Sequence, residues 1–160
     1  MSEIKGGNLQ RINWTRVFLG GLLAGVVINI GEFLINGLLL ADRWAAGMKA
    51  LGRSPSLGLL PYAIFNLWGF LIGLFAIWLY ATIRPRFGAG PRTAVIAAIA
   101  TWVPGCLLAS LGPVAMHLFS RRLYAAGVVG ALIEIIAATL IGAWLYRERE
   151  TAPLAAAAAH

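Results

Sequence analysis

Four long apolar runs take up most of this chain, and each is long enough to cross a lipid bilayer. They lie at about residues 15–41, 57–83, 92–118 and 123–146. A helix needs about 20 apolar residues to cross the hydrocarbon core. Composition agrees, since 60% of the residues are hydrophobic and 12% charged, against about 45–50% and about 25% in soluble domains. We therefore expect an all-α polytopic membrane protein, a bundle of four transmembrane helices.

The spans and their short loops leave no room for a sizeable soluble domain. Residues 1–150 are therefore expected to form a single four-helix transmembrane domain, and residues 151–160 a low-complexity tail. Between the first two spans, Trp44, Met48 and Leu51 share one helical face. This spacing predicts a short helix lying in the membrane plane after the first span, with an ordinary basic loop as the alternative.

The charge of the chain fits a membrane protein better than a nucleic-acid-binding protein. The formal net charge is +7, from 13 Lys and Arg against 6 Asp and Glu. The basic residues lie mostly at the ends of the apolar runs, where they would anchor against lipid headgroups. Four spans place both termini on one side, and that side carries eight Lys and Arg against five. We expect a bacterial inner (plasma) membrane location with both termini cytoplasmic, and no nucleic-acid partner.

Two acidic residues, Glu32 and Glu134, lie near the middle of apolar runs. A carboxylate at that depth is costly, so we expect both to face protein or a water-filled cavity. They also share a pattern, since an Ala-Gly-Val-Val segment precedes each acid, with four residues between. An internal duplication and a coincidence in a restricted alphabet both account for this repeat.

Each span has one small or polar face, which we expect to point into the bundle. In the first span, glycines are followed by amides and an acid within roughly 80° of a helical wheel. The candidates for ligand or ion binding are Asn29, Glu32, Asn36, Asn66 and Glu134. The candidates for close helix packing are Gly21, Gly25, Gly69, Gly73, Gly127 and Gly130.

The third span differs from the others because it contains prolines. Pro104 and Pro113 each remove a backbone donor and predict a kink. Cys106 and His117 share a face of this span with Pro113. We expect Cys106 to be a small buried residue and His117 to lie at a helix end near the interface. Too few His and Cys residues are present to hold a metal or haem, so we expect no metal and no cofactor.

Three functional hypotheses follow from the two acids. No Lys or Arg lies in the apolar parts of the spans, so the acids must be neutral, amide-paired, hydrated, or bound to a cation or ligand. The first hypothesis, which we favour, is a non-enzymatic membrane subunit or homo-oligomer that packs through its glycine-rich and Glu/Asn-bearing faces. Its partners would be membrane lipids, further copies of the chain or other membrane protein subunits.

The second hypothesis is a small proton- or cation-linked transporter or channel that uses Glu32 and Glu134 near the bilayer midplane. The third is an intramembrane enzyme with the two carboxyls as acid and base. The sequence holds no catalytic motif that supports this, so we expect no catalytic residues and no enzyme activity.

Overall fold

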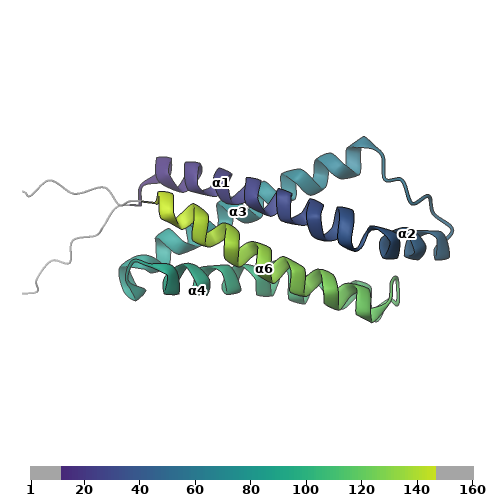
Figure 1. Cartoon of the computed structure of the whole chain (residues 1–160). Helices are drawn as coiled ribbons and strands as arrows, with labels where there is room; N and C mark the ends of the chain where they lie inside the picture. The colour runs from purple at the N-terminus through teal and green to yellow at the C-terminus, as the bar shows by residue number, and fades with distance from the viewer. Residues whose placement is uncertain (1–11, 147–160) are drawn as a thin grey trace, which may run out of the picture.

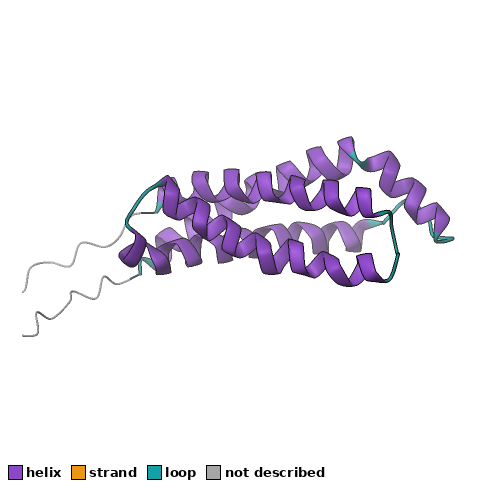
Figure 2. Ribbon diagram, turned by 90° about the horizontal axis from the view of Figure 1, so that it is seen from below, coloured by secondary structure: helices purple, strands orange, loops and turns teal. Residues whose placement is uncertain are grey.

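The computed structural model describes residues 12–146, and every regular element among them is a helix (Figures 1 and 2). In chain order the elements are α1 (Trp14–Glu32), η1 (Phe33–Leu39), α2 (Ala41–Ala50), α3 (Leu59–Phe87), α4 (Pro91–Trp102), η2 (Val103–Leu108), α5 (Ala109–Ala115) and α6 (Arg121–Leu145). The two η segments are π-helices. The predicted tail and the last residues of the predicted domain lie outside the described residues.

Four continuous helical stretches are long and apolar enough to span a membrane. They are Trp14–Leu39, Leu59–Phe87, Pro91–Ala115 and Arg121–Leu145. The all-helical class and the four apolar helices predicted from sequence are therefore confirmed. The third stretch ends three residues before the predicted boundary, while the second continues through Pro85 to Phe87. A proline in the last turn of a helix keeps helical φ and removes only one backbone hydrogen bond.

The helices form an elongated bundle with both described chain ends at the same end (Figure 1). There the backbone N–H of Asn13 donates to the Tyr146 hydroxyl at 3.4 Å. The Tyr146 ring meets the Tyr80 ring edge to face, with centroids 5.9 Å apart. The Tyr80 hydroxyl in turn accepts from the N–H of Gly90, in the loop between α3 and α4. We refer to the half of the bundle next to these residues as the terminal half.

Glycines set the close approach of helices in the terminal half. A Cβ added at Gly142 of α6 would lie 2.5 Å from the carbonyl oxygen of Gly20 in α1. A Cβ at Gly21 would lie 2.8 Å from Cα of Leu74 in α3. Since real Cβ atoms do not come this close to backbone atoms, these contacts require glycine. The small-residue seams of α1 are thus used for packing within the chain.

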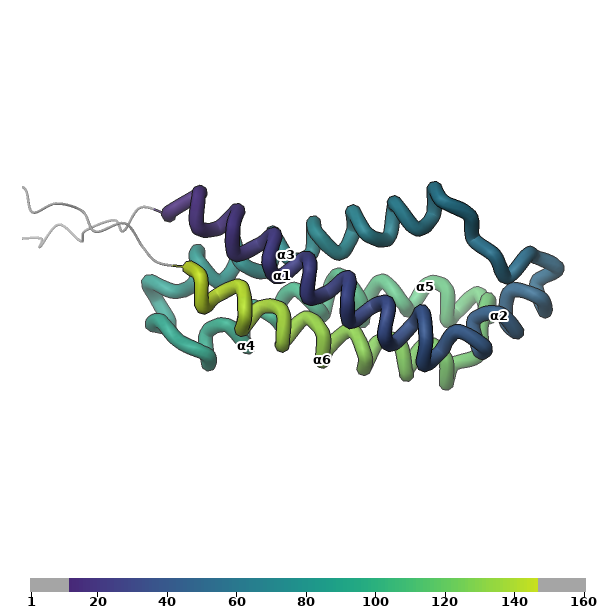
Figure 3. The backbone as a smooth tube through the Cα atoms, turned by 45° about the horizontal axis from the view of Figure 1, so that its top comes forward, coloured from purple at the N-terminus to yellow at the C-terminus, as the bar shows by residue number. Residues whose placement is uncertain are grey.

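The opposite half, which we call the distal half, is less closely packed. Figures 1 and 3 show the first part of α3 running away from α1 toward the loop after α2. Residues 62–68 are all exposed, and the Phe65 side chain is 61% exposed. In a membrane this stretch would face lipid or another protein.

Both π-helices lie in the distal half and were not predicted. The sequence reading assumed uninterrupted α-helices, but η1 follows directly on Glu32, and the N–H of Leu40 donates to the Ile35 carbonyl five residues back. In η2 the second residue is Pro104, which has no N–H to donate. A π-helical turn takes in the extra residue where the α-helical bonding is interrupted.

The predicted short helix after the first span is confirmed as α2, and an aromatic cluster holds it against α6. The Trp44 ring meets Phe119 and Tyr124 edge to face, with centroids 5.1 and 6.1 Å away. Gly47 lies under Phe119, since a Cβ there would be 2.5 Å from the Phe119 ring. Whether α2 lies in the membrane plane stays a prediction.

Candidate carboxylate site

Glu134 is the one buried acid among residues 12–146. It lies midway along α6 and its residue is 5% exposed. Gly31 of α1 packs on it, since a Cβ at Gly31 would lie 2.5 Å from Glu134 Cγ. Oε1 is buried and has no hydrogen-bond partner. Such an oxygen costs free energy in a low-dielectric interior unless a proton, water or cation satisfies it.

Glu32 ends α1 and is exposed on the surface of the single chain. The prediction that both acids face the interior is therefore right for Glu134 and wrong for Glu32. The physical reason is the divergence of α3, whose exposed first turns leave this part of α1 uncovered. An exposed carboxyl in an apolar span needs a proton, a ligand or a neighbouring protein.

A chain of hydrogen bonds links Glu32 to the end of the bundle at α2. Asn36 Nδ2 donates to Glu32 Oε2 at 2.6 Å. Trp44 Nε1 donates to Asn36 Oδ1 at 3.0 Å. The indole therefore fixes the amide, which presents its N–H to the carboxyl. Sequence reasoning selected Asn36 but missed Trp44, which was read only as an apolar face residue.

The two acids lie close together, and we refer to them as the carboxylate cluster. Glu134 packs on Gly31, the residue before Glu32. The cluster therefore lies between the end of α1 and the middle of α6. Cys106 of η2 is only partly buried. The apolar surroundings of the cluster supply no Lys or Arg, because the sequence has none in these stretches.

Asn29 and Asn66, the other two predicted binding residues, form a separate bridge between α1 and α3. Asn29 Nδ2 donates to the Gly25 carbonyl at 2.8 Å and to the Asn66 carbonyl at 3.2 Å. Gly69 leaves room for this amide, since a Cβ there would lie 2.8 Å from its atoms. Asn66 Nδ2 donates to Tyr62 of its own helix. Both amides satisfy backbone carbonyls, and the Asn29 amide braces α1 against α3.

The six predicted packing glycines all lie on helices of the bundle. They differ in how close the neighbouring helix comes. Gly21, Gly25, Gly69 and Gly73 lie where α1 meets α3. Gly130 faces Ile35 of η1, with 2.9 Å from an added Cβ to the side chain. Gly127 has more room, since a Cβ there would be 3.8 Å from Asn36 Oδ1. Sequence reasoning missed Gly20, Gly31 and Gly142.

The residues predicted to share one face of the third span, Ser110 among them, do not all lie on one helix. The Ser110 hydroxyl donates to the Leu107 carbonyl at 2.7 Å. His117 lies beyond the end of α5, in a left-handed conformation with φ of 54°. The prediction that it shares a helical face with Cys106 is therefore wrong, because the helix ends at Ala115. Residues 12–146 contain no group of three or more His, Cys, Asp or Glu able to hold a metal ion.

A second unpredicted hydrogen bond ties the π-helical region to α6. Trp102, the residue before η2, donates its Nε1 to the Val128 carbonyl at 2.9 Å. In the sequence, Pro104 and Gly105 indicate an irregular turn here. No sequence pattern indicates that the Trp102 indole would donate to α6. Trp102 and Trp44 therefore hold the elements around the acids in place.

The repeated segments lie in unlike surroundings. Gly25 packs on Phe70 of α3, whereas Gly127 adjoins Asn36 and Trp44. Glu32 is exposed, whereas Glu134 is buried. The repeat therefore does not give two equivalent sites.

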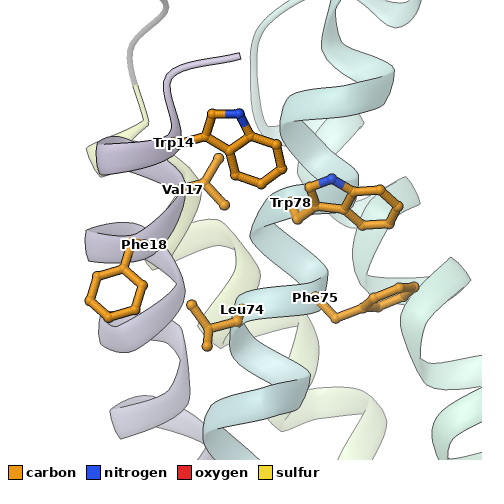
Figure 4. A pocket seen from close by; sticks show the side chains of 6 residues that line it. All are labelled: Trp14, Val17, Phe18, Leu74, Phe75 and Trp78. Atoms are coloured by element: carbon orange, nitrogen blue, oxygen red, sulfur yellow. The ribbon is translucent and has the colours of Figure 1, made fainter.

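An apolar cleft of about 440 Å³ lies away from the acids, between α1 and α3 in the terminal half (Figure 4). Its lining is Trp14, Val17, Phe18, Leu74, Phe75 and Trp78. These side chains offer apolar contact and no acid, base or nucleophile. The chemistry of the described residues is therefore concentrated at the carboxylate cluster.

Comparisons of this chain with protein-family models, with curated proteins and with solved structures find no match.

Proposed function

We propose that this chain is an integral membrane protein whose Glu134 and Glu32 bind a proton or a small cation in support of transport. This is the second hypothesis that the sequence raises. We further propose a bacterial inner membrane location with cytoplasmic termini, from the distribution of Lys and Arg. No enzymatic role is proposed, since no nucleophile and base lie in a catalytic arrangement among the described contacts.

The observation that carries the proposal is the unpartnered, buried Oε1 of Glu134. A carboxyl in an apolar interior is costly unless it holds a proton or a counterion. The apolar parts of the spans offer no Lys or Arg to act as that counterion. A bound proton or cation would neutralise this group, and exchange of such an ion is the basis of coupled transport.

Glu32 supports the proposal because it provides a step between Glu134 and the outside of the bundle. It is exposed, and it follows Gly31, on which the Glu134 side chain packs. It is also the end of the hydrogen-bond chain from Trp44 through Asn36. A proton or cation taken up at Glu32 would therefore pass inward to Glu134.

The test is flux in proteoliposomes. Purified protein is reconstituted, and proton, Na⁺ and K⁺ movement is followed under an imposed gradient with a pH-sensitive dye and ion electrodes. We expect flux well above that of empty liposomes. Glu134→Gln should reduce it to background, because the amide keeps the shape but cannot exchange a proton. Glu32→Gln should reduce it less, since this group is the outer one.

The matched control is Asp42→Asn, which removes the acid in the first turn of α2. It should leave flux unchanged while all three variants elute from size exclusion like the wild type. Flux that persists in both Glu134→Gln and Glu32→Gln would exclude the proposed mechanism.

A second candidate function is a non-enzymatic membrane subunit, and a specific observation favours it. Glu32 is exposed, and so is Asn66, which belongs to a stretch of α3 that is uncovered over residues 62–68. Polar groups on a lipid-facing surface are stabilised when another helix covers them. A further copy of this chain or another membrane protein would provide that cover.

The subunit candidate is tested by crosslinking in native membranes. Cys106 is replaced by Ala, and a cysteine is placed at Phe65 or, as a control, at Trp144, which is 80% exposed in the terminal half. A Phe65→Cys variant that forms disulfide dimers, with a monomeric Trp144→Cys variant, supports assembly through α3. Monomers in both cases would reject this candidate.

A further inference from the structure

We propose that the distal end of the molecule binds the phosphate group of an anionic phospholipid, in a basic cleft between α2 and the start of α6. The cleft has a volume of about 890 Å³. Its lining includes Arg43, His117, Arg121 and Arg122 together with apolar side chains of both elements. The inference rests on the membrane location of the chain and goes beyond the carboxylate site.

Three arginines converge on this cleft from two elements far apart in the sequence. Arg43 comes from α2, while Arg121 and Arg122 open α6. No Asp or Glu is among the lining residues, so the cleft has a net positive charge. Guanidinium groups match the geometry of phosphate oxygens and bind them with paired hydrogen bonds.

The start of α6 adds backbone donors to the same cleft. Ser120 caps this 25-residue helix, its side chain accepting from the N–H of Leu123 at 3.3 Å. The N–H groups of Arg121 and Arg122 have no acceptor within the helix, as in any first turn. The helix dipole places partial positive charge at this end, which favours an anion.

The apolar part of the lining indicates a lipid rather than a soluble phosphate compound. Leu51, Leu118 and Leu123 line the cleft together with the arginines. Leu123 is buried, so it forms the floor of the cleft, whereas Leu118 is exposed. The cleft also lies at the end of four apolar helices, where headgroups would be found. A phospholipid would place its phosphate on the arginines and its upper acyl chains on the leucines.

His117 has an unusual backbone conformation at the rim of this cleft. Its φ of 54° lies in the left-handed region that favours glycine. Its N–H donates to the Val114 carbonyl and that of Leu118 to the Pro113 carbonyl, so it follows the helix end in a Schellman motif. Glycine would suit this position better, so His117→Gly removes the imidazole without backbone cost. This gives a test variant that is expected to fold.

The experiment is native mass spectrometry of the full chain in detergent, with added phosphatidylglycerol or phosphatidylcholine. We expect phosphatidylglycerol to be retained in preference to phosphatidylcholine. The variant Arg43→Gln/Arg121→Gln/Arg122→Gln should bind phosphatidylglycerol at least about tenfold more weakly, because each charged hydrogen bond contributes more than a factor of a few. His117→Gly should weaken binding by about twofold to fivefold, through loss of one donor.

The control variant is Arg86→Gln/Arg92→Gln, which removes two exposed arginines at the other end of the bundle. It should retain phosphatidylglycerol like the wild type. A second arm adds inorganic phosphate, which should not displace the lipid. Equal lipid binding by the triple variant and the wild type would overturn the proposal. Displacement by inorganic phosphate would also overturn it, assigning the cleft to soluble phosphate compounds. Glu134→Gln should leave lipid binding unchanged, so this outcome is independent of the transport test.

Discussion

The terminal and distal halves of the bundle use the same kinds of helix in different ways. In the terminal half, backbone meets backbone through Gly20 and Gly142, and Tyr146 bonds to Asn13, so the two ends of the described part of the chain are joined. In the distal half, α3 diverges, two π-helices interrupt the spans and two carboxyls lie among apolar side chains. The terminal half is closely packed. The distal half holds Glu134, whose Oε1 has no hydrogen-bond partner, and Glu32, which other helices of the chain do not cover.

This difference indicates how a bundle of apolar helices could carry costly groups in a membrane. Close glycine packing supplies dispersion contacts, which would stabilise the fold in lipid, where no hydrophobic force acts between helices. The distal half can then keep an unpartnered Glu134 oxygen and an exposed Glu32 without unfolding. Substitutions in the terminal half should therefore affect stability most. Substitutions in the distal half should affect transport or binding most.

The largest effect on stability is expected from Gly142→Leu. The new Cβ would lie 2.5 Å from the Gly20 oxygen and 2.7 Å from Ile77, so α1 and α6 must separate. We expect a loss of about 3 kcal/mol or more in the free energy of unfolding, since overpacking alone costs about 1–3 kcal/mol. Thermal unfolding in detergent, followed by tryptophan fluorescence, measures this.

The control for that substitution is Gly112→Ala in α5, where an added Cβ meets nothing within 4 Å. It should raise stability slightly, because alanine favours a helix over glycine by about 1 kcal/mol. Equal losses in both variants would contradict the assignment of the close contact to the terminal half.

The next largest loss of stability is expected from Asn36→Leu in the distal half. It removes the bond to Glu32 Oε2 and leaves the Trp44 indole N–H unpaired. The cost should be about 1–3 kcal/mol. Asn66→Leu serves for comparison, because its exposed amide bonds only to its own helix and its loss should cost little. A larger effect of Asn66→Leu on thermal stability would refute the importance of the Trp44–Asn36–Glu32 chain.

A small rise in stability is expected from His117→Gly. Glycine takes the left-handed conformation without the cost of about 1 kcal/mol borne by other residues. The melting temperature should therefore rise. His117→Ala also removes the imidazole but keeps the unfavourable φ, so it should not raise stability. A rise with alanine and not with glycine would show that the side chain, and not the backbone, sets the effect.

The smallest effect is expected from Asp42→Asn, in the first turn of α2. Loss of this charge removes a favourable interaction with the helix dipole, worth about 0.5 kcal/mol. Added salt should reduce the difference from the wild type in thermal unfolding, because the site is exposed. A loss of several kcal/mol would mean that Asp42 has a partner beyond its own helix.

The sequence alone was sufficient for the positions of the four apolar helices and for the burial of Glu134. Run length predicts the helices. The central place in an apolar run predicted burial for both acids, and it was right for Glu134 alone. The π-helices were missed because a helical wheel assumes 3.6 residues per turn throughout. The exposure of Glu32 depends on where α3 diverges, which is a property of tertiary packing.

The basic cleft could not be predicted from a single stretch of sequence. Arg43 and Arg121 come together only because the Trp44–Phe119 contact brings α2 onto the start of α6. In the sequence, these arginines were used only to predict which side of the membrane each loop faces. The pairing of Trp44 with Asn36 is likewise set by the turn at Leu40, which no local pattern indicates.

The most direct test of the account is whether Glu134 exchanges a proton or cation in the membrane. Infrared difference spectra are recorded on reconstituted protein with ¹³C-labelled glutamate, while pH or Na⁺ concentration is changed. We predict a protonated carboxyl band that shifts with the label, responds to the change and disappears in Glu134→Gln. A wild-type spectrum without any such responsive carboxyl band, or one that is unchanged in Glu134→Gln, would contradict the account.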